Sequence, residues 1–162
     1  ALPTDSLNIA LENKSLHRNF MGYTAGKTQL MIGLGMSAIS DSWYGFAQNE
    51  KKVEHYQERV NLGKLPVFRG HLLSDTDLTI RKHILDLMCN LETVWNDDLS
   101  EEVKDGILEQ LSEIRNDDLL IVADDKLIVK EEARMFVRNV CMAFDLRLIR
   151  NKPSTRIFSM TI

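Results

Sequence analysis

The most constraining feature of this 162-residue chain is an apolar run that contains two glycines. It extends from Leu30 to Ile39, with Gly33 and Gly35 inside it. An apolar run bounded by turn-forming residues is typical of a buried strand. Glycines inside a strand mark a bulge, or a place where another backbone or a ligand approaches closely. We therefore expect Leu30–Ile39 to form one buried strand beside a ligand site.

Short, distinctive blocks lie on both sides of this strand. An aromatic turn, Asn19-Phe20-Met21-Gly22-Tyr23-Thr24, comes before it, and the run continues as Ser37-Ala38-Ile39-Ser40. The later blocks are Phe46–Asn49, Phe68–Gly70, Ser74–Asp77, Ile80–Lys82, Met88–Asn90, Arg138–Asp145 and Phe158–Ile162. In this order the blocks resemble the oxygen-independent coproporphyrinogen III oxidases, radical S-adenosylmethionine (SAM) enzymes of haem biosynthesis. The resemblance covers essentially the whole chain.

The resemblance implies that the chain is the C-terminal portion of a larger oxidoreductase. Residues 1–48 would be the end of an incomplete radical SAM barrel, and residues 49–162 a helical C-terminal domain with a β-hairpin wing. The intact enzyme would use SAM, a 4Fe-4S cluster and an electron donor to decarboxylate coproporphyrinogen III oxidatively to protoporphyrinogen IX. In such enzymes the cofactor performs the difficult chemistry and the protein positions it.

The ligands of the cluster are not in this sequence. A radical SAM cluster is held by three thiolates in a CxxxCxxC loop, and thiolate ligation is general for such clusters. The chain has two cysteines, Cys89 and Cys141, and both lie in apolar helical patterns. Its four histidines show no metal-ligand spacing. We expect no metal site, no catalytic residue, no bound cofactor and no oxidase activity in this fragment.

The resemblance singles out two residues as cofactor-binding. The isoleucine of the SAIS segment is Ile39, and in the family it lies against SAM, where an apolar side chain would pack on the adenine or ribose. The aromatic turn departs from the family at Met21, where glutamine is more common. Methionine cannot replace the hydrogen bonds of an amide. Met21 lies in the SAM-side turn and is the second candidate, but it cannot make a polar ligand contact of that kind, which leaves the exact substrate open.

The remaining sequence predicts helices and an extended segment. Helices are expected over Asp5–Asn13 and Asn49–Val60, the second ended by Gly63, followed by an extended edge segment over Leu65–Leu73. Ser74 caps the next helix, with Asp77 in its first turn. The apolar face of that helix is formed by Ile80, Ile84, Leu87, Met88 and Leu91.

Residues 100–149 predict a helix, a hairpin and a second helix. Ser100 caps the first helix, whose apolar stripe is Val103, Ile107, Leu111 and Ile114. A hairpin follows over Leu119–Val122 and Leu127–Val129, and a final helix over Glu131–Ile149. The expected core residues of that helix are Ala133, Phe136, Val137, Val140, Cys141, Phe144 and Leu148. The predicted fold class is α+β, mostly helical: a barrel-edge strand segment followed by a helical, winged-helix-like C-terminal domain.

Charge and composition limit the partners. The stretch from Asp97 to Asp118 contains nine acidic and two basic residues, and the net charge of the whole chain is -4. Nucleic-acid binding requires clustered Lys and Arg, so we expect none. No apolar run is long enough to span a membrane. Two cysteines without a disulfide framework favour a reducing compartment, the cytoplasm.

The sequence leaves alternatives for the function and for two surfaces of the chain. The intact protein could instead be a related radical SAM haem chaperone or methyltransferase, and the fragment could be a free-standing winged-helix interaction module. The arginine-rich stretch 131–162 is either a solvated face or a contact for the four propionates of coproporphyrinogen III. Without its barrel, Leu30–Ile39 would lack strand partners, and the fragment would self-associate through this edge.

Overall fold

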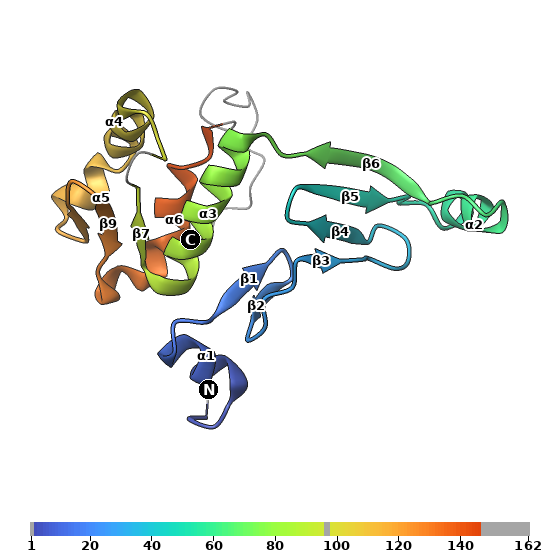
Figure 1. Cartoon of the computed structure of the whole chain (residues 1–162), viewed down its shortest axis with the longest axis horizontal. Coiled ribbons are helices and arrows are strands. Elements are labelled where there is room, and N and C mark those ends of the chain that lie inside the picture. Colours follow the sequence, from blue (N-terminus) through green and yellow to red (C-terminus); the bar gives the residue numbers. More distant parts are fainter. Residues whose placement is uncertain (1, 96–97, 147–162) are drawn as a thin grey trace. The chain divides into compact units, whose positions relative to one another are not determined.

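The computed structural model describes residues 2–95 and 98–146 (Figure 1). The chain divides into two units, Ala1–Thr79 and Ile80–Ile162. Helix α3, Asp75–Asn90, begins in the first unit and continues into the second. The expected domain division at residues 48 and 49 stays a prediction for the intact protein. In the described residues this position lies at the end of one strand of a continuous sheet.

The first unit opens with a helix and a hairpin. Helix α1, Ser6–Glu12, is capped by Asp5, whose Oδ1 accepts the Leu7 amide at 2.8 Å, so the predicted helix is confirmed. The hairpin consists of β1, His17–Asn19, and β2, Gly22–Thr24. Its turn is closed by Asn19 Oδ1, which accepts the amides of Met21 at 2.9 Å and Gly22 at 3.2 Å.

A four-stranded antiparallel sheet follows in this unit, in the order β3-β4-β5-β6 (Figure 1). The strands are β3 Leu30–Met31, β4 Ile39–Ser42, β5 Gly45–Asn49 and β6 Val67–Leu72. The prediction of one strand over residues 30–39 is wrong. The chain reverses between β3 and β4, with Gly35 at φ +99° and Ser37 at φ +60°. These left-handed conformations cannot continue a strand.

Helix α2, Val53–Asn61, lies in the sequence between β5 and β6. It ends in a Schellman motif. The amide of Gly63, at φ +67°, donates to Val60 O, and the amide of Lys64 donates to Arg59 O, both at 2.9 Å. The glycine stop is thus confirmed, and β6 is the edge strand that the extended segment predicted.

The cap of α3 is a reciprocal pair of hydrogen bonds. Ser74 Oγ accepts the Asp77 amide at 3.2 Å, and Asp77 Oδ2 accepts the Ser74 amide at 2.9 Å. This is a capping box, with aspartate in the place of the usual glutamate. The helix buries Ile80, Leu87 and Met88 on the predicted face, while Ile84 is partly buried.

The second unit combines short helices with a three-stranded sheet. After α3 come β7 Glu92–Val94, α4 Glu101–Gln110, α5 Ser112–Asn116, β8 Leu120–Val122, β9 Lys126–Val129, the 3-10 helix η1 Glu131–Phe136 and α6 Val137–Met142. The hairpin of β8 and β9 is confirmed. Strand β7, which the sequence did not predict, pairs with β9 and gives the antiparallel order β7-β9-β8. Ser100 stands at the N-cap of α4 but forms no side-chain cap bond.

The expected continuous helix over Glu131–Ile149 is not observed. The chain forms a 3-10 helix and then α6, which ends at Met142. The 3-10 turns place Phe136 on the surface, 41% exposed, so its predicted core role is wrong. The other described members of the predicted set, Ala133, Val137, Val140, Cys141 and Phe144, are buried. Leu148 lies outside the described residues.

The apolar core lies in the second unit. Its fully buried side chains include Leu87, Ile107, Leu127 and Phe144, with Trp95 beside Phe144. Each such side chain stabilises the fold by about 1.5–3 kcal/mol. Among the described residues of the first unit, Ala10 is the one apolar residue that is buried. Overall the chain mixes helix and antiparallel sheet, as an α+β class predicts. None of the helices in the described ranges is long and apolar enough to cross a membrane.

Candidate cofactor site

A buried amide organises the glycine loop between β3 and β4. Asn49, 6% exposed, donates from Nδ2 to Gly33 O at 3.0 Å and to Gly35 O at 2.9 Å. The glycine amides also have partners: Gly33 N donates to Ser40 Oγ, and Gly35 N donates to Tyr56 OH, both at 3.1 Å. Side chains from β4, β5 and α2 therefore hold both glycines in place.

The C-terminal half of the loop is fixed by main-chain bonds. Ser37 N donates to Glu50 O at 2.8 Å, and Asn49 N donates to Ala38 O at 2.9 Å. Gln48 Nε2 donates to Ser37 O at 3.3 Å. The main-chain amides and carbonyls of Gly33, Gly35 and Ser37 are thus all bonded within the protein, which makes this loop a preorganised structural element.

The two glycines serve different purposes. A Cβ at Gly33 would lie 2.7 Å from the carbonyl oxygen of Ile39, so only glycine fits there. The close approach predicted for a glycine is confirmed at this position, and the partner is the backbone of β4. A Cβ at Gly35 would meet no atom within 4 Å, so its glycine is explained by the positive φ.

The two residues assigned to SAM lie in separate sheets of the first unit. Ile39 is half-buried and begins β4, opposite Gln48 of β5. Met21 is in the turn of the β1 and β2 hairpin, with its side chain 77% exposed. The SAM contacts of both residues stay predictions.

One face of the four-stranded sheet carries a polar row next to Ile39. Gln48 pairs with Ile39 on one side and with Arg69 of β6 on the other. Directly opposed residues of antiparallel strands project to the same face. Arg69 Nε donates to Gln48 Oε1 at 2.9 Å. The blocks FAQN and FRG are visible in the sequence, but only the strand register shows that they meet.

An ion pair between a buried carboxylate and a half-exposed guanidinium joins α2 to this sheet. The carboxylate of Glu50, which directly follows β5, is 3.0 Å from Arg59 Nε of α2. Glu50 is 8% exposed, and removing one partner from such a pair leaves an uncompensated buried charge. Together with the Tyr56 hydroxyl, this pair explains how a helix without a single buried residue keeps its place.

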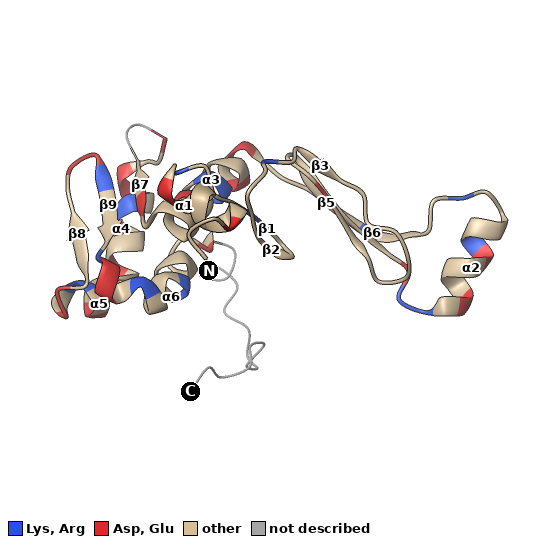
Figure 2. Ribbon diagram, turned by 90° about the horizontal axis from the view of Figure 1, so that it is seen from below, with Lys and Arg blue, Asp and Glu red and all other residues tan. Residues whose placement is uncertain are grey.

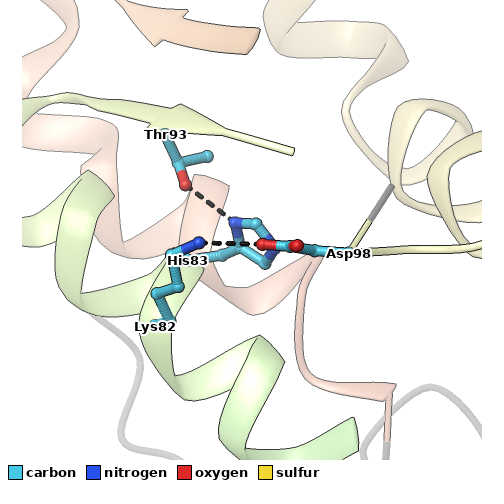
Figure 3. A network of polar contacts seen from close by, with 4 residues as sticks. All are labelled: Lys82, His83, Thr93 and Asp98. Carbon is cyan, nitrogen blue, oxygen red and sulfur yellow. Dashed lines mark hydrogen bonds and ion pairs between the residues drawn. The ribbon is translucent and has the colours of Figure 1, made fainter. Parts of the chain in front are cut away.

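The second unit contains a separate polar network (Figure 3). His83 is fully buried on α3, and its Nδ1 shares a 2.8 Å hydrogen bond with Thr93 Oγ1 of β7. Lys82 Nζ contacts Asp98 Oδ2 at 2.8 Å. Burial and the neighbouring Lys82 lower the pKa of His83, while Asp98 opposes the shift. The hydrogen bond from Lys82 lowers the pKa of Asp98.

His83 is a neutral structural side chain. Its ring lies 5.9 Å from that of Phe144, and its Nε2 is buried without a hydrogen-bond partner among the described residues. A protonated imidazolium in this apolar setting would be costly. Its burial and its hydrogen bond to Thr93 give this histidine a structural role.

The described residues do not fit an iron-sulfur cluster. Cys89 on α3 and Cys141 on α6 are both buried, and Cys141 Sγ lies 3.9 Å from the carbonyl oxygen of Ile84. In the part of the chain that is described, no three His, Cys, Asp or Glu side chains are grouped as metal ligands. No reaction step can be derived from these cysteines.

Comparison with known proteins gives one consistent result. No family model matches the chain. Oxygen-independent coproporphyrinogen III oxidases from Salmonella typhimurium and Synechocystis are each 33% identical over the whole chain, and that from Escherichia coli is 32% identical. The chain spans only 36–37% of the length of these relatives.

A solved structure agrees with these relatives. It is coproporphyrinogen III oxidase (HemN) from Escherichia coli, described as a radical SAM enzyme, with a TM-score of 0.83 and 32% identity. The match covers 91% of this chain and 36% of that one. The fold is therefore that of a part of a radical SAM enzyme. More particularly, the chain is homologous to a part of the oxygen-independent coproporphyrinogen III oxidases, which confirms the resemblance found in the sequence.

Proposed function

We propose that the chain is the C-terminal portion of an enzyme that decarboxylates coproporphyrinogen III oxidatively to protoporphyrinogen IX. The observation that carries this proposal is the similarity to such oxidases over the whole chain, together with the TM-score of 0.83. SAM and a 4Fe-4S cluster held elsewhere in the longer protein would supply the radical chemistry. This chain would form one wall of the SAM pocket.

The surface of the first unit supports its assignment to the end of a barrel. The exposed fractions of Leu30, Ile32 and Leu34 are 58%, 67% and 85%. Contiguous exposed apolar side chains mark an interaction surface. We assign this surface to contact with the preceding part of the longer protein, so that residues 1–48 complete the barrel and residues 49–162 follow as the C-terminal domain.

The second unit fits the proposed winged-helix-like domain. Its α3 and α4, the β8 and β9 hairpin as wing, and α6 occur in the expected order. Nucleic acid is not its proposed partner, because α4 and α5 contain a series of acidic residues (Figure 2). These are Glu101, Glu102, Asp105, Glu109 and Glu113. Repulsion of phosphates would follow.

The remaining assignments belong to the same proposal. Ile39 would pack on the adenine or ribose of SAM, and the Met21 turn would lie on the SAM side. The partners would be coproporphyrinogen III and an electron donor, and the setting would be the cytoplasm without membrane attachment. The separated fragment would self-associate through the β3 edge.

The test is anaerobic turnover by the full-length protein with coproporphyrinogen III, SAM and a reductant. Formation of protoporphyrinogen IX with release of carbon dioxide is the expected result. SAM cleavage without decarboxylation would point instead to the related haem chaperones or methyltransferases. A full-length protein that neither binds a cluster nor cleaves SAM would overturn the proposal.

A further inference from the structure

We propose that Arg69 is a binding residue that holds a carboxylate of the ligand lying against Ile39. This inference rests on the proposed function, because that function places a ligand at Ile39. It adds a residue and a chemical role that the family resemblance did not assign. The shared ligand chemistry is a carboxylate, present in SAM and in the propionates of coproporphyrinogen III.

The strand register places Arg69 and Ile39 in one row. Ile39 of β4 opposes Gln48 of β5, and Gln48 opposes Arg69 of β6. All three side chains therefore project from the same face. Neighbouring strands are about 4.8 Å apart, so the backbones of Ile39 and Arg69 are separated by about 10 Å. A ligand whose apolar part rests on Ile39 can reach Arg69 with a carboxylate at this range.

Gln48 orients the guanidinium of Arg69. Its Oε1 accepts from Arg69 Nε at 2.9 Å, while its Nε2 donates to Ser37 O at 3.3 Å. The amide is thus fixed from both ends. With Nε occupied, the two terminal nitrogens of Arg69 remain as a fork, and this fork matches the two oxygens of a carboxylate.

The charge of Arg69 is not neutralised by the described residues. Three other cations of the first unit have an internal partner: Arg59 pairs with Glu50, and Arg18 and Lys27 lie over the rings of Tyr23 and Trp43. The side-chain partner of exposed Arg69 is the neutral amide of Gln48. An oriented guanidinium without a carboxylate is suited to an anionic ligand.

The next row of the same face has a polar side chain at each end. Asp41 of β4 opposes Phe46 of β5, which opposes His71 of β6. The opposite face at the level of Gln48 is formed by the small residues Ser40, Ala47 and Gly70. The groups able to bind a charged ligand are therefore gathered on the face that carries Ile39.

The experiment uses the full-length enzyme with Arg69→Gln, which removes the charge and the fork. The matched control is Lys64→Gln, which removes one exposed charge just before β6. Equilibrium dissociation constants are measured anaerobically for SAM, for coproporphyrin III and for its tetramethyl ester. Loss of a charge-assisted, bidentate contact is expected to weaken binding of one carboxylate ligand by about 10- to 100-fold.

The pattern of losses identifies the source of the carboxylate. Weaker coproporphyrin binding with unchanged ester and SAM binding assigns Arg69 to a propionate. Weaker SAM binding with unchanged coproporphyrin binding assigns it to the SAM carboxylate. Wild-type affinity for both ligands overturns the inference, and so does equal weakening of all three, which reports damage to the sheet. Failure of the wild-type enzyme to decarboxylate its substrate would instead refute the proposed function.

Discussion

Replacing Thr93 by valine tests whether the second unit depends on its buried polar pair. Thr93 is 2% exposed, and its Oγ1 shares a 2.8 Å hydrogen bond with Nδ1 of fully buried His83. Valine has the same shape but no hydroxyl, so no cavity is created. Since His83 Nε2 has no partner among the described residues, the variant leaves both ring nitrogens unsatisfied there.

The expected loss is about 1–3 kcal/mol in the free energy of unfolding, the cost of an unsatisfied buried polar group. Urea denaturation followed by the fluorescence of buried Trp95 measures it, in a Trp43→Phe background that removes the other indole. The urea midpoint should fall by about 1 M. The matched control is Thr76→Val, the same change at an exposed position of α3, which should shift stability by no more than about 0.5 kcal/mol. A similarly small effect of Thr93→Val would refute the reasoning.

The same network predicts a dependence on pH. The folded-state pKa of His83 is lowered, so the unfolded chain binds more protons as pH falls through about 6.5. Stability should therefore decrease below that pH and level off below the folded pKa. The lowered pKa of Asp98 acts in a more acidic range, since its stabilisation is lost below about pH 3.9. His83→Gln should flatten the profile below about pH 6.5, and an unchanged slope would show that another group causes the pH dependence.

Three further predictions concern the glycine loop, SAM and the cluster. In the full-length enzyme, Ile39→Asp should weaken SAM binding by at least tenfold through desolvation of a carboxylate, and Ile39→Val should not; equal affinities would make Ile39 purely structural. Asn49→Ala should expose the backbone amides around Gly33 and Gly35 to hydrogen exchange. Unchanged protection would mean that the Asn49 side chain is not needed to hold the loop. Reconstitution of the 162-residue fragment with iron and sulfide should give no cluster absorption, no SAM cleavage and no oxidase activity; a stoichiometric cluster would contradict the assignment.

Local chemical signals in the sequence were sufficient where neighbours in the chain determine the structure. The Ser74 cap, the Gly63 stop and the β8 and β9 hairpin all depend on residues a few positions apart, and all three are confirmed. The core of the second unit likewise follows from helical spacing, as Leu87 and Val140 show. These features depend on residues that are close together in the sequence.

The polar row and the glycine loop could not be predicted in this way. The meeting of Gln48 and Arg69 depends on pairing between segments separated by α2 and on an irregularity between Gln48 and Asn49. The apolar run near Leu30 predicted a buried strand, because apolar side chains are usually buried. Leu30, Ile32 and Leu34 are exposed instead, so the apolar pattern gave no information about the local turn.

We predict self-association of the fragment from the same exposed run. Strand β3 is an edge of its sheet, and the side chains of Leu30, Ile32 and Leu34 are largely exposed beside it. Unpaired edge groups next to apolar side chains favour pairing with another chain. The described part of the first unit also has almost no apolar core to hold it in a unique arrangement. Burial of these side chains between two copies would supply the missing stabilisation.

The decisive variant is Leu34→Glu, which places a charge in the most exposed part of the run without touching a main-chain bond. Size-exclusion chromatography with light scattering should show that it is monomeric at concentrations where the fragment is dimeric or larger. Ile121→Lys, at a half-exposed position of edge strand β8, is the matched control and should leave the association unchanged. A shortened chain starting at Leu73 keeps the Ser74 cap and the core of the second unit, so it should be monomeric and folded. A wild-type fragment that is monomeric, with its β3 amides protected from exchange, would show that the edge is already satisfied within one chain.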